Sequence, residues 1–365
     1  MCWAPSAYSG CCSRSSSSSA PACSASVRGC AACRRSPGSD PLSNLLTIWI
    51  PTYQREASLL ELLHSLEQAG LAAIADVIVS DNDPVSSLGH SLQFQGHSLS
   101  YRRNVANLSA GVNFLRAFEV VTTPWLMIVG DDDFFTPAAR DILIQTIDDL
   151  PEDITAVKYD SGLFGRQSAC TVTALSGYLD TMLAADYPQA FNNLLLVSNW
   201  LFRTAPCRRH LATAYLGYST KFSHLLPPLK ACAQDGYRLM FSPLRPVSHG
   251  VSEAGWPKAA TWYEMAISLS TFCGIIDAEN RRALQRMLFH RDWARMVVKC
   301  LRVRPFYGSR SQGVRPLTIH LHLALLSWHY GLVMVLLAPL LWIPQAWYPR
   351  ILRQKLGDPG RVERW

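Results

Sequence analysis

Three consecutive carboxylates, Asp131, Asp132 and Asp133, follow the short apolar run 125–129 and a glycine. An apolar run of this length that ends in turn residues predicts a buried strand, so the carboxylates lie just past its C-terminal end. Carboxylates packed together repel one another, and a hard divalent cation that also carries phosphates is their natural partner. The alternative is an acidic turn that caps a helix starting near Pro137.

Three more polar clusters each follow a predicted strand. The strands are expected at 45–50, 77–79 and 99–102, and the clusters are 51–56, 80–83 and 104–113. In open α/β sheets, ligands bind in the crevice outside the carboxyl ends of the strands. The four clusters together therefore predict one ligand-binding crevice along one edge of a sheet.

The elements that must position these clusters alternate along the chain. Helices with apolar residues at helical spacing are expected between the strands, at 58–69, 113–121 and 137–150. This alternation predicts an α/β fold built on a mostly parallel sheet with helices on both faces.

The second half of the chain is less regular. Strands are expected at 156–159, within 194–203, at 237–241 and at 244–248, and helices at 222–233, 261–276 and 278–303. The pair Pro227-Pro228 must kink or restart the helix that contains it, because proline cannot continue the backbone hydrogen bonding.

Charge is distributed unevenly along the 365 residues. Residues 281–365 hold 15 basic and three acidic side chains, and no Lys, Arg, Asp or Glu lies between Arg315 and Arg350. The apolar part, 321–343, is long enough to cross a bilayer, although its histidines, glycine and prolines weaken a simple span. Basic residues beside it predict a membrane surface as partner, with a core helix as the alternative. No nucleic-acid-binding motif is present.

Five segments follow from composition and pattern. They are a low-complexity leader at 1–44, two halves of the α/β domain at 45–150 and 151–257, a basic helical region at 258–315 and an apolar C-terminal segment at 316–365. The leader lacks the apolar core of a secretory signal and is expected to be disordered. The 11 cysteines form no regular framework, which favours a reducing compartment.

The ordered set of motifs resembles the family 2 glycosyltransferases of GT-A fold. The matching features are the strand followed by Pro51-Thr52-Tyr53-Gln54-Arg55, the strand ending in Asp81, the Asn107…Asn113 helix start, and the Asp-x-Asp formed by Asp131 and Asp133. The resemblance covers residues 45–150 well and 151–250 more loosely. Gln54 and Ser109 depart from it, since the family has Asn and Gly at these positions.

The resemblance implies a site for a nucleoside-diphosphate sugar. Its donor-binding residues would be Pro51, Thr52, Tyr53, Arg55, Glu56, Asp81, Asn107, Asn113, Asp131 and Asp132. Asp81 would accept a hydrogen bond from a base N–H group, with an Asx turn before Pro84 as the alternative. Helix capping is the alternative role for Asn107 and Asn113.

The resemblance also implies a metal and a general base. Asp131 and Asp133 would hold Mg²⁺ or Mn²⁺, with His249 as a further ligand. An inverting enzyme needs a group that takes the proton of the acceptor hydroxyl. His224, at the start of the helix before Gly236, is the candidate, and Asp235 is the second choice. The alternatives are a capping or packing histidine and a turn aspartate.

These features predict a metal-dependent, inverting glycosyltransferase of the hexosyltransferase type. Its acceptor would be a glycan, lipid-linked, at the cytoplasmic face of the membrane, in the synthesis of a cell-surface polysaccharide. A nucleotidyltransferase of similar fold and a non-catalytic glycan-binding relative are the alternatives. The first would usually carry a glycine-rich, basic loop after the first strand, and residues 51–56 lack one.

Overall fold

The computed structural model describes residues 45–91, 99–163, 167–184, 190–250, 268–269 and 271–289. The predictions made for 1–44, for 316–365 and for most of 258–315 lie outside these residues. Within the described ranges no helix is both long and apolar enough to cross a membrane.

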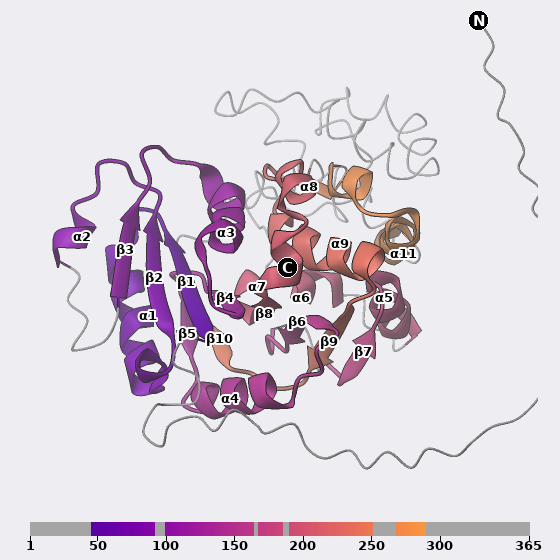
Figure 1. The fold of residues 1–365 in the computed structure, drawn as a ribbon, viewed down its shortest axis with the longest axis horizontal. Coiled ribbons are helices and arrows are strands. Elements are labelled where there is room, and N and C mark those ends of the chain that lie inside the picture. The colour runs from indigo at the N-terminus through magenta and orange to yellow at the C-terminus, as the bar shows by residue number, and fades with distance from the viewer. Residues whose placement is uncertain are drawn as a thin grey trace, which may run out of the picture. The chain divides into compact units, whose positions relative to one another are not determined.

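An eight-stranded sheet with the order β3-β2-β1-β4-β8-β6-β9-β7 forms the centre of the fold (Figure 1). Its strands are β1 (Leu46–Thr52), β2 (Asp76–Asp81), β3 (Leu99–Arg103), β4 (Trp125–Ile128), β6 (Ile154–Tyr159), β7 (Cys170–Val172), β8 (Trp200–Arg203) and β9 (Arg238–Ser242). β8 is antiparallel to both of its neighbours and β7 is antiparallel to β9. The other strands share one direction, so the α/β prediction is confirmed, and the sheet is mixed.

The parallel strands end level with one another. Thr52, the last residue of β1, pairs in register with Asp81, the last residue of β2, and Asp81 pairs with Arg103 of β3. β4 runs beside β1, and the amide of Val129 donates to the carbonyl of Trp49. The polar residues that follow these strands therefore meet at one edge of the sheet, as the sequence predicts.

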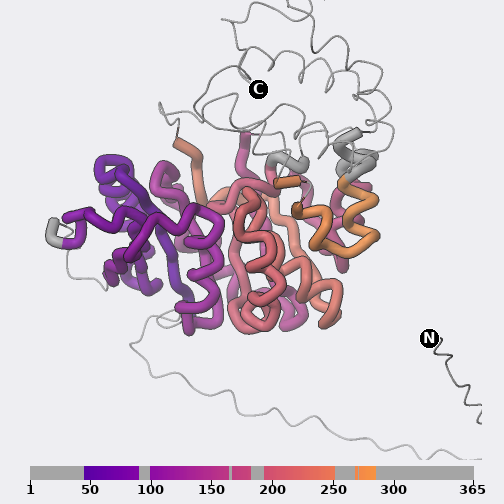
Figure 2. Tube along the Cα trace, turned by 90° about the horizontal axis from the view of Figure 1, so that it is seen from above, coloured from indigo at the N-terminus to yellow at the C-terminus, as the bar shows by residue number. Residues whose placement is uncertain are grey.

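Helices cover both faces of the sheet. They are α1 (Glu56–Gln68), α2 (Leu88–Ser91), α3 (Ser109–Val120), α4 (Ala139–Asp149), α5 (Leu175–Ala184), α6 (Ala190–Leu195), α7 (Thr204–Arg208), α8 (Leu211–Tyr215), α9 (Leu226–Asp235) and α11 (Ala278–Phe289), with short 3₁₀ turns η1 (Leu71–Ala73), η2 (Val197–Asn199) and η3 (Ser223–Leu225). One hydrophobic core packs α1 and α4 on one face, and a second packs α3, α5 and α7–α9 on the other. α3 lies beside α7 and α8 (Figure 2).

One local feature differs from the prediction, and another agrees with it. Asp133–Phe135 forms a strand, β5, that pairs antiparallel with β10 (Val247–His249) in a separate two-stranded sheet. The sequence predicts only a loop here, because an acidic triplet is unfavourable in a strand. Pro227 and Pro228 restart the helical run, as predicted: η3 ends at Leu225, and both prolines stand in the first turn of α9, where the missing N–H groups cost nothing.

Candidate active site

The acidic triplet forms the link between β4 and β5. The amide of Asp133 donates to the carbonyl of Gly130 over 3.1 Å, which closes a tight turn. The register of β5 with β10 then places His249 directly opposite Asp133. The β5–β10 pair explains why Asp133 is buried even though it follows a surface turn.

Asp131 is held by the last residue of β1, Thr52, and by Arg55 in the loop that follows. The hydroxyl of Thr52 donates to its Oδ2 over 2.7 Å, and Nη1 of Arg55 donates to its Oδ1 over 3.1 Å. The same Nη1 lies 3.0 Å from Oδ2 of Asp132. Burial raises the pKa of Asp131, while the hydrogen bond from Thr52 and the charge of Arg55 act in the opposite direction.

Asp133 has a different set of partners. Nδ1 of His249 lies 2.8 Å from its Oδ1, and the hydroxyl of Ser198 donates to its Oδ2. The Ser198 oxygen also accepts the amide of Gly130 over 2.8 Å. Nε2 of His249 lies 2.6 Å from Oδ1 of Asn199. Two residues of η2 therefore fix both the turn and the histidine.

The donor atoms of this cluster suit a hard divalent cation. Carboxylate oxygens from Asp131 and Asp133 with one imidazole nitrogen from His249 form a ligand set that Mn²⁺ accepts readily and Mg²⁺ less so. In the described ranges no three His, Cys, Asp or Glu side chains already converge on a common point. A metal ion at this cluster would have to replace some of the present partners of these side chains, such as the contact between His249 and Asp133.

Asp81 lies deeper in the same edge, at the end of β2. Its Oδ1 accepts the amide of Asp83 over 2.8 Å, which is the Asx turn considered as the alternative. Its Oδ2 accepts the hydroxyl of Tyr101 over 2.8 Å. The Tyr101 ring packs so closely on Gly89 that a side chain there would meet it at 2.5 Å. Tyr101, which the sequence analysis did not single out, therefore orients Asp81.

The two asparagines of the α3 region have different roles. Oδ1 of Asn107 accepts the amide of Ser109, which forms an Asx turn just before α3; the N-cap residue of this helix is Leu108. Asn113 is fully buried and exchanges hydrogen bonds with Ser80: it accepts the Ser80 hydroxyl and donates to the Ser80 carbonyl. Ser109 has a φ of 70°, so this serine occupies the left-handed position at which the family has glycine.

The remaining donor-site candidates lie between the end of β1 and the start of α1. Pro51 lies within β1, and Glu56 is in the first turn of α1. Gln54 has a φ of 55° and its amide donates to Oδ2 of Asp83, which ties the loop to the end of β2. Tyr53 is 42% exposed, so an aromatic face is available beside this loop.

Neither candidate for the general base contacts the triplet. His224 is fully buried, with its ring edge-on to Phe114, and burial lowers its pKa to about 3. Asp235 is the last residue of α9, just before β9 begins. It therefore lies at the amino ends of the parallel strands, whereas the triplet lies at their carboxyl ends. There its Oδ2 lies 2.8 Å from Nε2 of His210 and 3.0 Å from Nη2 of Arg209.

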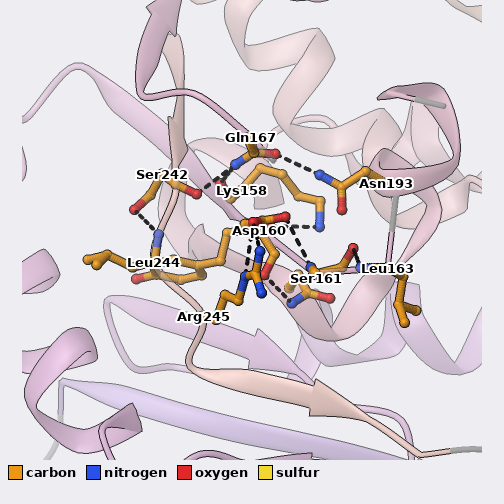
Figure 3. Close-up of polar contacts among 12 residues, drawn as sticks. Lys158, Asp160, Ser161, Leu163, Gln167, Asn193, Ser242, Leu244 and Arg245 are labelled. Atoms are coloured by element: carbon orange, nitrogen blue, oxygen red, sulfur yellow. Dashed lines mark hydrogen bonds and ion pairs between the residues drawn. The ribbon is translucent and has the colours of Figure 1, made fainter. Parts of the chain in front are cut away.

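A second polar network lies at the ends of β6 and β9 (Figure 3). Nε and Nη2 of Arg245 both donate to Oδ2 of the buried Asp160. Gln167 donates to the carbonyls of Lys158 and Ser242 and so bridges the two strands. The Asp160 carbonyl accepts the side-chain amide of Asn199.

The network was not predicted, although it left a signal in the sequence. Asp160 follows the strand predicted at 156–159, as Asp81 follows the one at 77–79. Lys158 is fully buried, and burial holds its pKa well below the usual range, against the charges of Asp160 and Asp133. Its Nζ donates to the Tyr159 carbonyl over 3.1 Å and lies over the Trp200 ring.

Comparison with known proteins connects this geometry with a family. Residues 47–168 match the family described as glycosyl transferase family 2. TarS 1–349 from S. aureus is similar in structure: its complex with UDP shows 16% identity, coverage of 81% of this chain and 86% of the TarS 1–349 chain, and a TM-score of 0.51. Its complex with UDP-GlcNAc covers the same shares at 14% identity with a TM-score of 0.50.

A third solved structure is the mannosyltransferase PcManGT from Pyrobaculum calidifontis in complex with GDP-Man and Mn²⁺. It shows 14% identity, coverage of 80% of this chain and 84% of PcManGT, and a TM-score of 0.47. No curated protein sequence shows significant similarity to the chain.

Proposed function

We propose that this chain, whose residues 47–168 match glycosyl transferase family 2, is a member of that family and transfers a sugar from a nucleoside diphosphate to a hydroxyl group of a glycan. The observation that carries the proposal is the meeting of Thr52, Arg55 and the acidic triplet at the carboxyl ends of β1 and β4. Asp81 ends the neighbouring strand, in register with Thr52. A nucleoside diphosphate would extend along these strand ends, with its base near Asp81 and its diphosphate near the acidic triplet.

The nucleoside part of the donor would occupy the pocket at the ends of β1 and β2. Asp81, held by Tyr101, would accept a hydrogen bond from a base N–H group, and Tyr53 would offer its exposed ring. Asp131 and Asp132 would face the ribose and the diphosphate. Asn107 and Asn113 support this pocket by shaping the start of α3 and the end of β2.

The metal site would be formed by Asp131, Asp133 and His249. When bound, Mg²⁺ or Mn²⁺ would supply positive charge that stabilises the leaving nucleoside diphosphate. The protein's own part is to hold the carboxylates: Ser198 and the β5–β10 pair fix Asp133, and Asn199 fixes the His249 ring. The donor oxygens and the imidazole fit either ion, with the imidazole favouring Mn²⁺.

In the reaction an acceptor hydroxyl oxygen forms a bond to C1 of the sugar while the bond from C1 to the diphosphate breaks. Attack from the face opposite the leaving group inverts the configuration at C1. The acceptor proton passes to a base. Since His224 is buried beside Phe114 and Asp235 lies at the far edge, we assign this proton to neither residue.

The acceptor would be recognised near the C-terminal part of the chain. The run without charged residues between Arg315 and Arg350, with basic residues on both sides, supports a lipid-linked glycan acceptor at the cytoplasmic face of the membrane. Assembly of a cell-surface polysaccharide by hexosyl transfer would suit such a location.

A donor screen tests the proposal. The full chain would be incubated with Mn²⁺ and a panel of UDP-, GDP- and dTDP-sugars, and released nucleoside diphosphate would be measured. We expect one nucleotide to be favoured and turnover to be lost in Asp131→Asn. If no nucleotide sugar binds or turns over, in either Mn²⁺ or Mg²⁺, the proposal fails.

A further inference from the structure

One nitrogen of Arg55 occupies the space between two carboxylates of the triplet. Nη1 lies 3.1 Å from Oδ1 of Asp131 and 3.0 Å from Oδ2 of Asp132. The other oxygen of Asp131 already accepts the hydroxyl of Thr52. Both oxygens of Asp131 thus accept a hydrogen bond, but only the partner at Oδ1, Arg55, carries the kind of charge that a metal ion would replace.

A metal ion and this guanidinium group exclude each other from Oδ1. An ion bound there would lie about 2.1 Å from the oxygen. Nη1 stands 3.1 Å from the same oxygen, on the side shared with Asp132. Two positive charges a few ångströms apart repel strongly where water is partly excluded. One of them must leave when the other arrives.

Arg55 is the partner that is free to move. Its side chain is 38% exposed, whereas that of Asp131 is 7% exposed. Arg55 stands at the start of α1, and Nη1 makes its contacts with Asp131 and Asp132. A guanidinium group has five N–H donors in a fork that matches phosphate oxygens. A diphosphate brought to the triplet would give the displaced group a new partner.

We propose that Arg55 is a resident counter-ion of the acidic triplet, which yields its position to the divalent cation and turns to the diphosphate of the donor. The proposal rests on the proposed function, because it takes the metal and the nucleotide from it. The new element is that Arg55 neutralises the carboxylates of the triplet before the metal ion and the donor bind. It also gives Arg55 opposite effects on the two ligands, since Arg55 competes with the metal and assists the nucleotide.

The test compares three variants of the full chain with the wild type. Arg55→Gln removes the charge, and Arg55→Lys keeps it. Arg238→Gln is the matched control, because Arg238 also donates two hydrogen bonds to a carboxylate, that of Asp153, at the opposite edge of the sheet. Titration calorimetry would measure Mn²⁺ binding without nucleotide, and then UDP binding at saturating Mn²⁺.

We expect Arg55→Gln to bind Mn²⁺ about tenfold more tightly than the wild type, because a competing positive charge is gone. Its affinity for UDP should fall by about tenfold, the loss of one charge-assisted contact. Arg55→Lys and Arg238→Gln should keep the wild-type affinity for Mn²⁺. Thermal unfolding of each variant would show that the comparison is made on folded protein.

Equal or weaker Mn²⁺ binding in Arg55→Gln, while the wild type binds Mn²⁺, would overturn the counter-ion role and leave the proposed function standing. Lower thermal stability with an unchanged Mn²⁺ affinity would have the same meaning, since Arg55 would then serve the structure alone. If none of the proteins binds Mn²⁺, with or without UDP, the metal site of the proposed function fails together with this inference.

Discussion

Nδ1 of His249 lies 2.8 Å from Oδ1 of Asp133, across the antiparallel pair of β10 and β5. The two residues are far apart in the chain, and the strand pairing makes them neighbours. Asp133→Asn keeps the shape of this pair but removes the charge. We expect it to weaken Mn²⁺ binding by at least about tenfold, the loss of a charged ligand, and to abolish measurable transfer. Calorimetry and product release would measure both effects.

The control for Asp133 is Asp153→Asn, which alters a carboxylate at the opposite edge of the sheet. It should bind Mn²⁺ like the wild type. Wild-type Mn²⁺ affinity in Asp133→Asn would remove this residue from the metal site.

Tyr101 is expected to act on the nucleotide through Asp81. Tyr101→Phe removes the hydroxyl that donates to Oδ2 of Asp81 and leaves the ring on Gly89 in place. One such hydrogen bond is worth about 1 kcal/mol, so UDP affinity should fall about fivefold. Titration calorimetry would measure the affinity of the variant for UDP. In Asp81→Asn, the further change Tyr101→Phe should have a smaller effect, and an undiminished one would show that the two residues act separately.

Asp235→Asn should leave turnover within about twofold of the wild type, because a residue outside the site changes no transition-state contact. The carboxylate lies beside Arg209 and His210, at the edge of the sheet where β9 begins. Initial rates at saturating donor are the measurement. A loss of a hundredfold or more, in a variant with normal thermal stability, would place Asp235 in the reaction after all.

Asp160 and Arg245 should respond unequally to substitution. Asp160 is buried, whereas the Arg245 side chain is 47% exposed. Arg245→Gln leaves the buried carboxylate of Asp160 without its ion-pair partner and should lower the free energy of unfolding by about 3 kcal/mol. Asp160→Asn releases a guanidinium group that can reach water and should cost less. Denaturant unfolding of both variants and of the double variant gives the comparison, and a smaller cost for Arg245→Gln would contradict it.

His224 should influence stability in acid. Burial lowers its pKa to about 3, below the usual 6.5. The unfolded chain therefore binds the proton first, and the stability that the neutral ring confers is full above pH 6.5 and is lost as the pH falls toward 3. His224→Leu keeps an apolar contact with Phe114 and should flatten the decline in unfolding free energy between about pH 6.5 and 4. An unchanged slope would show that His224 is not the titrating group.

The meeting of Thr52, Asp81 and the triplet could be predicted because each polar cluster follows a buried strand. Thr52, Asp81 and the triplet lie where the ends of β1, β2 and β4 meet. This relation is local, since an apolar run and the residue after it suffice to place a side chain at the edge of a parallel sheet.

The rest of the site could not be predicted in the same way. Ser198 contacts Asp133 and Asn199 contacts His249, and these contacts depend on the antiparallel insertion of β8 and the pairing of β5 with β10. Single-sequence patterns carry little information on such long-range pairing. The base assignment relied on the position of a residue along a helix, and the structure puts His224 in the core and Asp235 at the wrong end of α9 for contact with the triplet.

Ser198 and His249, which together hold Asp133, have a consequence for how the protein is made. Asp133 is synthesised before Ser198 and His249, so at first the nascent chain has this carboxylate without the hydroxyl and the imidazole that later contact it. Domains tend to fold during synthesis from the N-terminus onward, but here β5 gains its pairing strand only when β10 emerges. The carboxylate of Asp133 therefore acquires its last partner only after β10 has been synthesised.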